Sequence, residues 1–203
     1  AVTMVNAGLY LVARLMPFVD VHHHGVSGLE DFGLIVAWIG GITAFMAASI
    51  AFVQNDIKKV LAYSTMSQLA YIFTGLGSAL YFLNIDEYYA GYFVLGASLF
   101  HLFNHAMAKG MLFMASGSVI HEVHHAHDHL HHGSDHGDHD FDPQDMRNMG
   151  GLASKLPITA TAMMFGSMSI IGIPLIGGFW SKEGIIAKTW SASFHADTLM
   201  LAP

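Results

Sequence analysis

Two histidines and a lysine interrupt an otherwise apolar stretch of the chain. Residues 100–118 read FHLFNHAMAKGMLFMASGS, which places His101, His105 and Lys109 four residues apart. Each four-residue step along a helix advances about 40° beyond a full turn, so the three side chains form one slowly winding stripe. Imidazole accepts and releases protons near neutral pH. A lysine at mid-membrane depth costs at least ~2.5–3.5 kcal/mol and commonly marks an ion or proton path. The stripe therefore predicts proton transfer, with pairing between helices as the alternative.

The same spacing also suits a metal pair, because His101 and His105 stand at i and i+4. Nothing nearby in the sequence supplies a third ligand, so we predict no metal site here. The chain contains no cysteine, which excludes a cysteine-ligated iron–sulfur cluster. We expect no cofactor in these residues.

A second polar stripe follows the motif NDIKKVLAYSTMSQLAYIF, residues 55–73. Ser64, Gln68 and Tyr71 fall at i, i+4 and i+7, on one side of an apolar helix. Their side chains could line a hydrated path that leads to Lys58, or could hydrogen-bond a neighbouring helix. The spacing of these residues favours neither interpretation over the other. Lys58 by itself could equally lie at the headgroup level.

A third candidate, Lys182, follows a stretch rich in helix-breaking residues, GIPLIGGFWSKEGI at 172–185. Broken helices at membrane depth are tolerated where they line a cavity, and transporters use them to build ion sites. The alternative is an interfacial anchor formed by Trp180 and Lys182. Sequence physics alone slightly favours the anchor.

Long uncharged segments must position these residues. The chain is 53% hydrophobic and only 11% charged, against about 25% charged in soluble domains. A helix crosses the hydrocarbon core with about 20 apolar residues. We expect an all-α, polytopic transmembrane helix bundle, with helices over 1–16, 32–53, 57–82, 89–120 and 157–180 and a further helical start near 183–192. The chain begins without Met, and we expect it to be a fragment of a larger membrane protein.

The segment HEVHHAHDHLHHGSDHGDHD holds nine histidines between His121 and His139. Such a tract cannot form a core, so we expect a water-exposed loop. Imidazole binds zinc, nickel or copper, but no ordered ligand spacing is evident and a solvated loop is the favoured interpretation. The expected organisation is transmembrane helices of a proton-translocating module in 1–120, a His/Asp-rich exposed loop in 121–146, and a broken helix with a following helix start in 147–203.

Four motifs together resemble one family. DIKKVLAYSTMSQLAY, FHLFNHAMAKGMLFMASGSVIH, QDMRNMGGLASKLPIT and GIPLIGGFWSKEGII are similar to the antiporter-like membrane subunits of respiratory complex I, above all its L subunit. The resemblance implies two inverted five-helix repeats, of which this chain would hold most of the second. It also implies that Lys58, His101, His105, Lys109 and Lys182 lie on an axis that carries protons. The His-rich insertion departs from the family pattern.

The resemblance implies a proton-translocating, non-redox subunit of an oxidoreductase. Electron transfer from NADH or F420H2 to quinone or methanophenazine would take place in other subunits. The implied partners are other membrane subunits of a complex I-like assembly, the lipid bilayer and protons, with no nucleic acid, in a prokaryotic cell membrane. The alternative is a secondary cation/proton antiporter subunit of the Mrp type. A membrane scaffold, whose buried lysines only pair helices, is a third interpretation.

Overall fold

The computed structural model describes residues 2–19, 30–131 and 141–195. Their regular structure is helical apart from one isolated bridge between Asp56 and Asp145. The α-helices are α1 (Val2–Val19), α3 (Glu30–Phe52), α4 (Ile57–Asn84), α5 (Tyr88–His131), α6 (Pro157–Ile171) and α7 (Gly177–His195). Two 3₁₀ turns, η1 (Met146–Asn148) and η2 (Leu152–Ser154), lie in the connection between α5 and α6. The predicted all-α class is confirmed.

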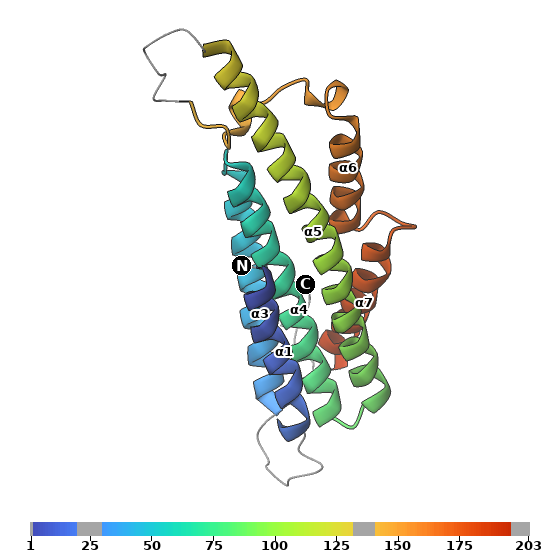
Figure 1. Ribbon diagram of the computed structural model, residues 1–203. Coiled ribbons are helices and arrows are strands. Elements are labelled where there is room, and N and C mark those ends of the chain that lie inside the picture. The colour runs from blue at the N-terminus through green and yellow to red at the C-terminus, as the bar shows by residue number, and fades with distance from the viewer. Residues whose placement is uncertain (1, 20–29, 132–140, 196–203) are drawn as a thin grey trace.

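The helices form an elongated bundle in which α4 is central (Figure 1). Helices α1 and α3 run alongside α4 on one side, and α5 runs along its other side over the full length of the bundle (Figure 1). Helices α6 and α7 follow one another along α5 and are separated by a short break in the helical structure (Figure 1). This arrangement brings the break between α6 and α7 next to the middle of α5.

Glycines permit the close approach of α3 and α4. A Cβ on Gly33 would lie 2.8 Å from the Gly77 carbonyl oxygen, and one on Gly77 would lie 2.4 Å from the Ala37 nitrogen. Small residues are the usual means by which membrane helices pack backbone against backbone. The Ser67 hydroxyl adds a bond from α4 to α3, donating to the Ala44 carbonyl at 2.9 Å.

The helix expected over 157–180 ends earlier, at Ile171, and the next begins at Gly177 rather than near 183. Gly172 adopts the left-handed conformation, with φ 87°, which a residue with a side chain rarely adopts. Its amide and that of Ile173 both donate to the Met168 carbonyl, at 3.1 and 3.2 Å. This is the arrangement that closes a helix with glycine, and Pro174 cannot continue it.

Helix α5 continues to His131, beyond its expected end at residue 120. The first part of the His-rich tract is therefore an exposed helix and not a loop. The reason is local: no glycine or proline interrupts the sequence between Ile120 and Gly133. Residues 132–140 of the expected loop lie outside the described residues, as do residue 1 and residues 196–203 of the expected terminal parts.

The connection after the tract returns to the start of α4. The Met146 amide donates to the Asn55 carbonyl at 2.8 Å, and the Ile57 amide to the Gln144 carbonyl at 3.1 Å. The carboxylate of Asp145 accepts from the Arg147 guanidinium at 2.5–3.0 Å and from the Arg147 amide at 2.9 Å. These bonds hold the pKa of Asp145 below its ordinary value.

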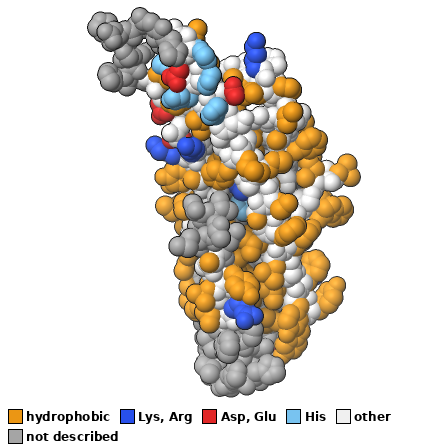
Figure 2. Space-filling view, viewed as in Figure 1, with side chains coloured by type: hydrophobic (Ala, Val, Ile, Leu, Met, Phe, Trp, Pro, Cys, Tyr) orange, Lys and Arg blue, Asp and Glu red, His pale blue; other side chains and the backbone are white. Residues whose placement is uncertain are grey.

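Two of the described helices are long and apolar enough to cross a membrane by length and composition alone, Phe32–Phe52 and Ile57–Asn84. Helix α5, which carries the buried stripe, is not one of them, and α6 is a shorter apolar helix. Figure 2 shows hydrophobic side chains spread over the visible face of the bundle, while histidine and acidic side chains gather at one end. The apolar outer face includes Phe45 of α3, which is 75% exposed.

Candidate functional site

Lys109 is fully buried in the middle of α5. Its ammonium group donates to the Ser64 hydroxyl at 2.9 Å and to the Leu61 carbonyl at 3.0 Å, both on α4. No carboxylate accompanies these contacts among the bonds that the described residues make to it. The lysine is therefore held by neutral oxygens.

His101 lies two turns before Lys109 and is also buried. Its Nε2 lies 3.1 Å from the Gln68 amide oxygen on α4, and its Nδ1 lies 2.9 Å from the Ser181 hydroxyl on α7. The Ser181 oxygen in turn lies 3.2 Å from the Gly178 carbonyl oxygen. His101 thus connects α4 to α7 through both ring nitrogens.

His105 stands between these two residues and is 2% exposed. Neither of its ring nitrogens has a hydrogen-bond partner among the described residues. The ring borders a narrow space with no room for a water molecule, which is lined by Gln68, His101, Asn104, His105, Ala108, Ser169, Ile170 and Gly178. Buried polar groups are almost always hydrogen-bonded to protein or to ordered water, so His105 is the member of the stripe whose ring lacks a partner among the described residues.

Lys182 lies at the break between α6 and α7. Its ammonium group turns inward and donates to the Ile170 carbonyl in the last turn of α6. A cation is favourable there, because the final carbonyls of a helix carry partial negative charge. The Lys182 carbonyl accepts from the Tyr71 hydroxyl at 2.9 Å, and the edge of the Tyr71 ring meets His101.

The structure brings most of the predicted residues together. Ser64, Gln68 and Tyr71 contact Lys109, His101 and Lys182 respectively, and each contact joins two helices. Lys58 lies apart from this cluster, exposed in the first turn of α4, with its amide bonded to Asp56.

Several residues of the cluster were not predicted. Ser181 adjoins Lys182 in sequence, but its bond to His101 spans 80 positions. Asn104 donates to the Gly177 carbonyl at 3.1 Å and fixes the start of α7 against α5. A Cβ on Gly178 would fall 1.8 Å from the Ser169 carbonyl oxygen, so only glycine fits there. The sequence GGFWS at 177–181 pointed to this region, because its two glycines permit close packing and its serine is polar.

The arrangement provides proton donors and acceptors in an order along the bundle, from Lys109 through His105 to His101, with Lys182 beside the helix break. Among the described residues no three histidine, cysteine or acidic side chains are grouped to hold a metal ion.

A family model described as NADH:quinone oxidoreductase/Mrp antiporter, TM, matches residues 1–202. The chain is similar to NAD(P)H-quinone oxidoreductase chain 5 of Picosynechococcus, with 43% identity over 95% of the chain and 24% of the relative. It is also similar to the chloroplastic subunit 5 of Physcomitrium patens, with 43% identity over 99% of the chain and 24% of the relative. The match to NADH-ubiquinone oxidoreductase chain 5 of Mycosarcoma maydis has 38% identity over 92% of the chain and 22% of the relative.

The chain thus spans about a quarter of the length of these relatives. The family match extends over nearly all residues of the chain. Helices α4 and α5 carry the polar residues of the motifs on which the resemblance was based. The expectation of an integral membrane protein is confirmed, and cyanobacterial relatives agree with a prokaryotic membrane. The chain belongs to the transmembrane family of NADH:quinone oxidoreductases and Mrp antiporters.

Proposed function

We propose that this chain forms part of a proton-translocating membrane subunit of a complex I-like oxidoreductase. Its relatives are named as chain 5 or subunit 5 of NAD(P)H-quinone or NADH-ubiquinone oxidoreductases. We therefore assign the chain to a subunit of the chain 5 kind, where the sequence motifs alone suggested the L subunit. Other membrane subunits of the assembly are the proposed partners.

The observation that carries the proposal is the buried line of His101, His105 and Lys109 in the middle of α5. Burying an ionisable side chain away from water is costly. Three of them on one stripe, connected to α4 and α7 by hydrogen bonds, exceed what helix pairing requires, because neutral hydroxyls and amides can pair helices.

Each residue has a distinct role in the proposed path. Lys109 holds a proton between Ser64 and the Leu61 carbonyl. His105, whose ring nitrogens have no partner among the described residues, relays protons between Lys109 and His101. His101 passes them between its two bonded nitrogens, and Lys182 receives them beside the α6 terminus. Lys58, exposed at the start of α4, is the proposed contact with the aqueous side.

In this proposal electron transfer takes place in other subunits, with NADH or F420H2 as donor and quinone or methanophenazine as acceptor. The names of the relatives favour a nicotinamide donor and a quinone acceptor. They are oxidoreductase subunits, so we prefer this function to that of an Mrp-type antiporter.

The test is the ratio of protons moved to electrons transferred by the intact parent complex in sealed vesicles. We expect Lys109→Ala and Lys109→Met each to lower this ratio while the complex assembles on a native gel. Lys59→Ala is the matched control, because Lys59 is an exposed lysine of α4 whose ammonium lies 3.8 Å from Asp56.

The two substitutions at position 109 separate transport from packing. Methionine preserves the length of the side chain and removes only its charge and its donors. If the methionine variant pumps normally, Lys109 serves only to pair helices and the proposal is wrong. If both variants assemble and lose pumping, the proton path is supported.

A further inference from the structure

We propose that the surface end of α5 carries a binding site for a divalent transition metal ion, of the class of Zn²⁺ or Cu²⁺, formed by His121, His124 and His125. This site is separate from the buried stripe and does not depend on the function proposed above. It arises because the His-rich tract starts as a helix, which fixes the relative positions of its first histidines.

The three histidines share one face of the helix. His124 and His125 stand at i+3 and i+4 from His121, so both lie next to it on the helix surface, one on each side. The rings of His121 and His125 are stacked with centroids 6.1 Å apart. Pairs of histidines at i and i+4 are a well-established zinc-binding arrangement on helices.

This face borders an open hollow of about 320 Å³, lined by Lys58, Gly117, Ile120, His121, His124 and His125. The three imidazoles are the metal-binding groups of that lining. Gly117 and Ile120 add no polar group that would compete with them for an ion. All three imidazoles therefore border one space in which a metal ion could bind.

A carboxylate supports one of the proposed ligands. The Nδ1 atom of His124 lies 3.1 Å from an Asp128 carboxylate oxygen. Metal-bound histidines typically donate their second ring N–H to a carboxylate, which orients the ring and leaves the other nitrogen for the metal. In this geometry Nε2 of His124 is the coordinating atom.

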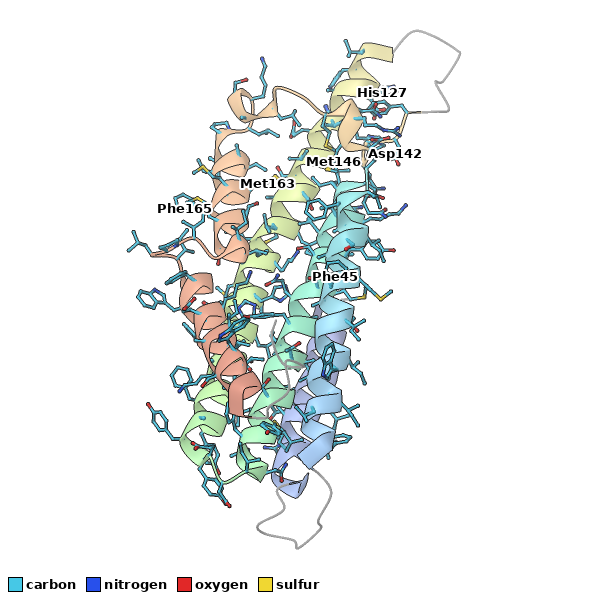
Figure 3. All side chains as sticks on the ribbon, turned by 180° about the vertical axis from the view of Figure 1, so that it is seen from behind. Phe45, His127, Asp142, Met146, Met163 and Phe165 are labelled. Atoms are coloured by element: carbon cyan, nitrogen blue, oxygen red, sulfur yellow. The ribbon has the colours of Figure 1, made fainter. Side chains whose placement is uncertain are left out.

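The local charge also favours a cation. The exposed part of α5 from His121 to His131 carries the carboxylates of Glu122 and Asp128 and no lysine or arginine, so it attracts positive ions. Figure 3 shows His127 and Asp142 at this end of the bundle, with Met146 of the returning connection nearby. Lys58 is the opposing charge, because its side chain lines the same hollow.

The described side chains do not yet converge on one point, since no group of three is placed to hold a metal. Binding therefore requires rotation of exposed imidazoles, which is inexpensive on a surface helix. Water completes the coordination of the ion. Imidazole ligands select Zn²⁺ and Cu²⁺ over Mg²⁺ and Ca²⁺, which prefer oxygen.

The test is titration of the full-length subunit with Zn²⁺ by calorimetry, and with Cu²⁺ by electron paramagnetic resonance. We expect one site tighter than the rest of the tract, with nitrogen coupling from at least two imidazoles. His121→Ala with His125→Ala should abolish this site. Asp128→Asn should weaken it by about tenfold, the lower end of what loss of an orienting partner costs.

Two further variants make the result specific. His127→Phe is the matched control: the His127 ring stacks on Phe141 with centroids 4.0 Å apart, and phenylalanine keeps that stacking without a ligand nitrogen. It should bind Zn²⁺ as the native chain does. Lys58→Gln removes the opposing charge and should tighten binding a few-fold.

The proposal is overturned if His127→Phe weakens Zn²⁺ binding as much as the double variant does, because the tract would then bind metal without a defined site. Unchanged binding in the double variant overturns it as well. Circular dichroism of each variant checks that α5 remains helical, so that a loss of affinity is a loss of ligands.

Discussion

The Lys109 ammonium group lies 2.9 Å from the Ser64 hydroxyl, across the interface of α5 and α4. This bond spans 45 positions in sequence and supports a fully buried cation with a neutral oxygen. Removal of the hydroxyl would leave the ammonium with the Leu61 carbonyl as its remaining described partner.

We therefore expect Ser64→Ala to lower proton pumping without preventing assembly. A hydrogen bond to a charged group contributes ~1.5–3 kcal/mol, so its loss weakens the support of the buried ammonium group. The measurement is the proton-to-electron ratio in vesicles. Thr74→Val is the control, because the Thr74 hydroxyl donates to the Ala70 carbonyl of its own helix. Equal losses in both variants would contradict the assignment.

The second prediction concerns His101. Ser181→Ala removes the hydroxyl at its Nδ1, and Gln68→Leu removes the amide at its Nε2. Each change leaves a buried ring nitrogen unpaired, at a cost of ~1–3 kcal/mol. We expect lower thermal stability and slower pumping in each single variant. Because both variants act on the same ring, the effects of the double variant should not add; additive losses would show that the two contacts are independent.

The helix break provides a third prediction. Gly178→Ala places a Cβ 1.8 Å from the Ser169 carbonyl oxygen, so α6 and α7 must separate. Overpacking of this kind costs ~1–3 kcal/mol or more, and we expect a lower melting temperature of the solubilised subunit. Gly110→Ala is the matched control, since no atom lies within 4 Å of its Cβ position. A stable Gly178→Ala variant would mean that the two helices are not tightly joined.

The sequence predicted the local part of this site and missed its long-range part. The spacing of His101, His105 and Lys109 follows from helix geometry, and so does the polar stripe of α4. The bond from Ser181 to His101 depends on how α7 packs against α5, which no periodicity encodes. The extension of α5 to His131 does not follow from the polar composition of the tract, which is typical of a loop; it follows from the absence of glycine and proline before Gly133.

A fourth prediction concerns the connection at the start of α4. The side-chain and backbone bonds from Arg147 hold the pKa of Asp145 below 3.8. The resulting stabilisation is therefore fully present above pH 3.8 and is lost as pH falls through the lower, folded-state pKa. In Arg147→Ala the pKa of Asp145 should rise toward its ordinary value, so the contact should open at higher pH than in the native chain.

Hydrogen exchange of the Met146 amide measures this opening, because that amide donates to the Asn55 carbonyl. The Lys155 amide, bonded to the Leu152 carbonyl in the same connection, serves as the reference at each pH. Equal protection of Met146 in the native chain and in Arg147→Ala, at every pH, would rule out a role for the ion pair in holding the connection.

The position of Ser181 has a consequence for the speed of events at His101. Its hydroxyl can donate to Nδ1, which leaves the imidazole neutral, or to the Gly178 carbonyl, so that Nδ1 carries a hydrogen and donates to the serine oxygen. Since Gln68 accepts at Nε2, the second pattern is that of the imidazolium. The two patterns differ by one proton on Nδ1 and by rotation of one hydroxyl, with no heavy atom displaced. Such rotations belong to the picosecond-to-nanosecond range, whereas helix and domain movements take microseconds to milliseconds. The hydroxyl rotation that accompanies a change of charge at His101 is therefore faster than any movement of the helices around it.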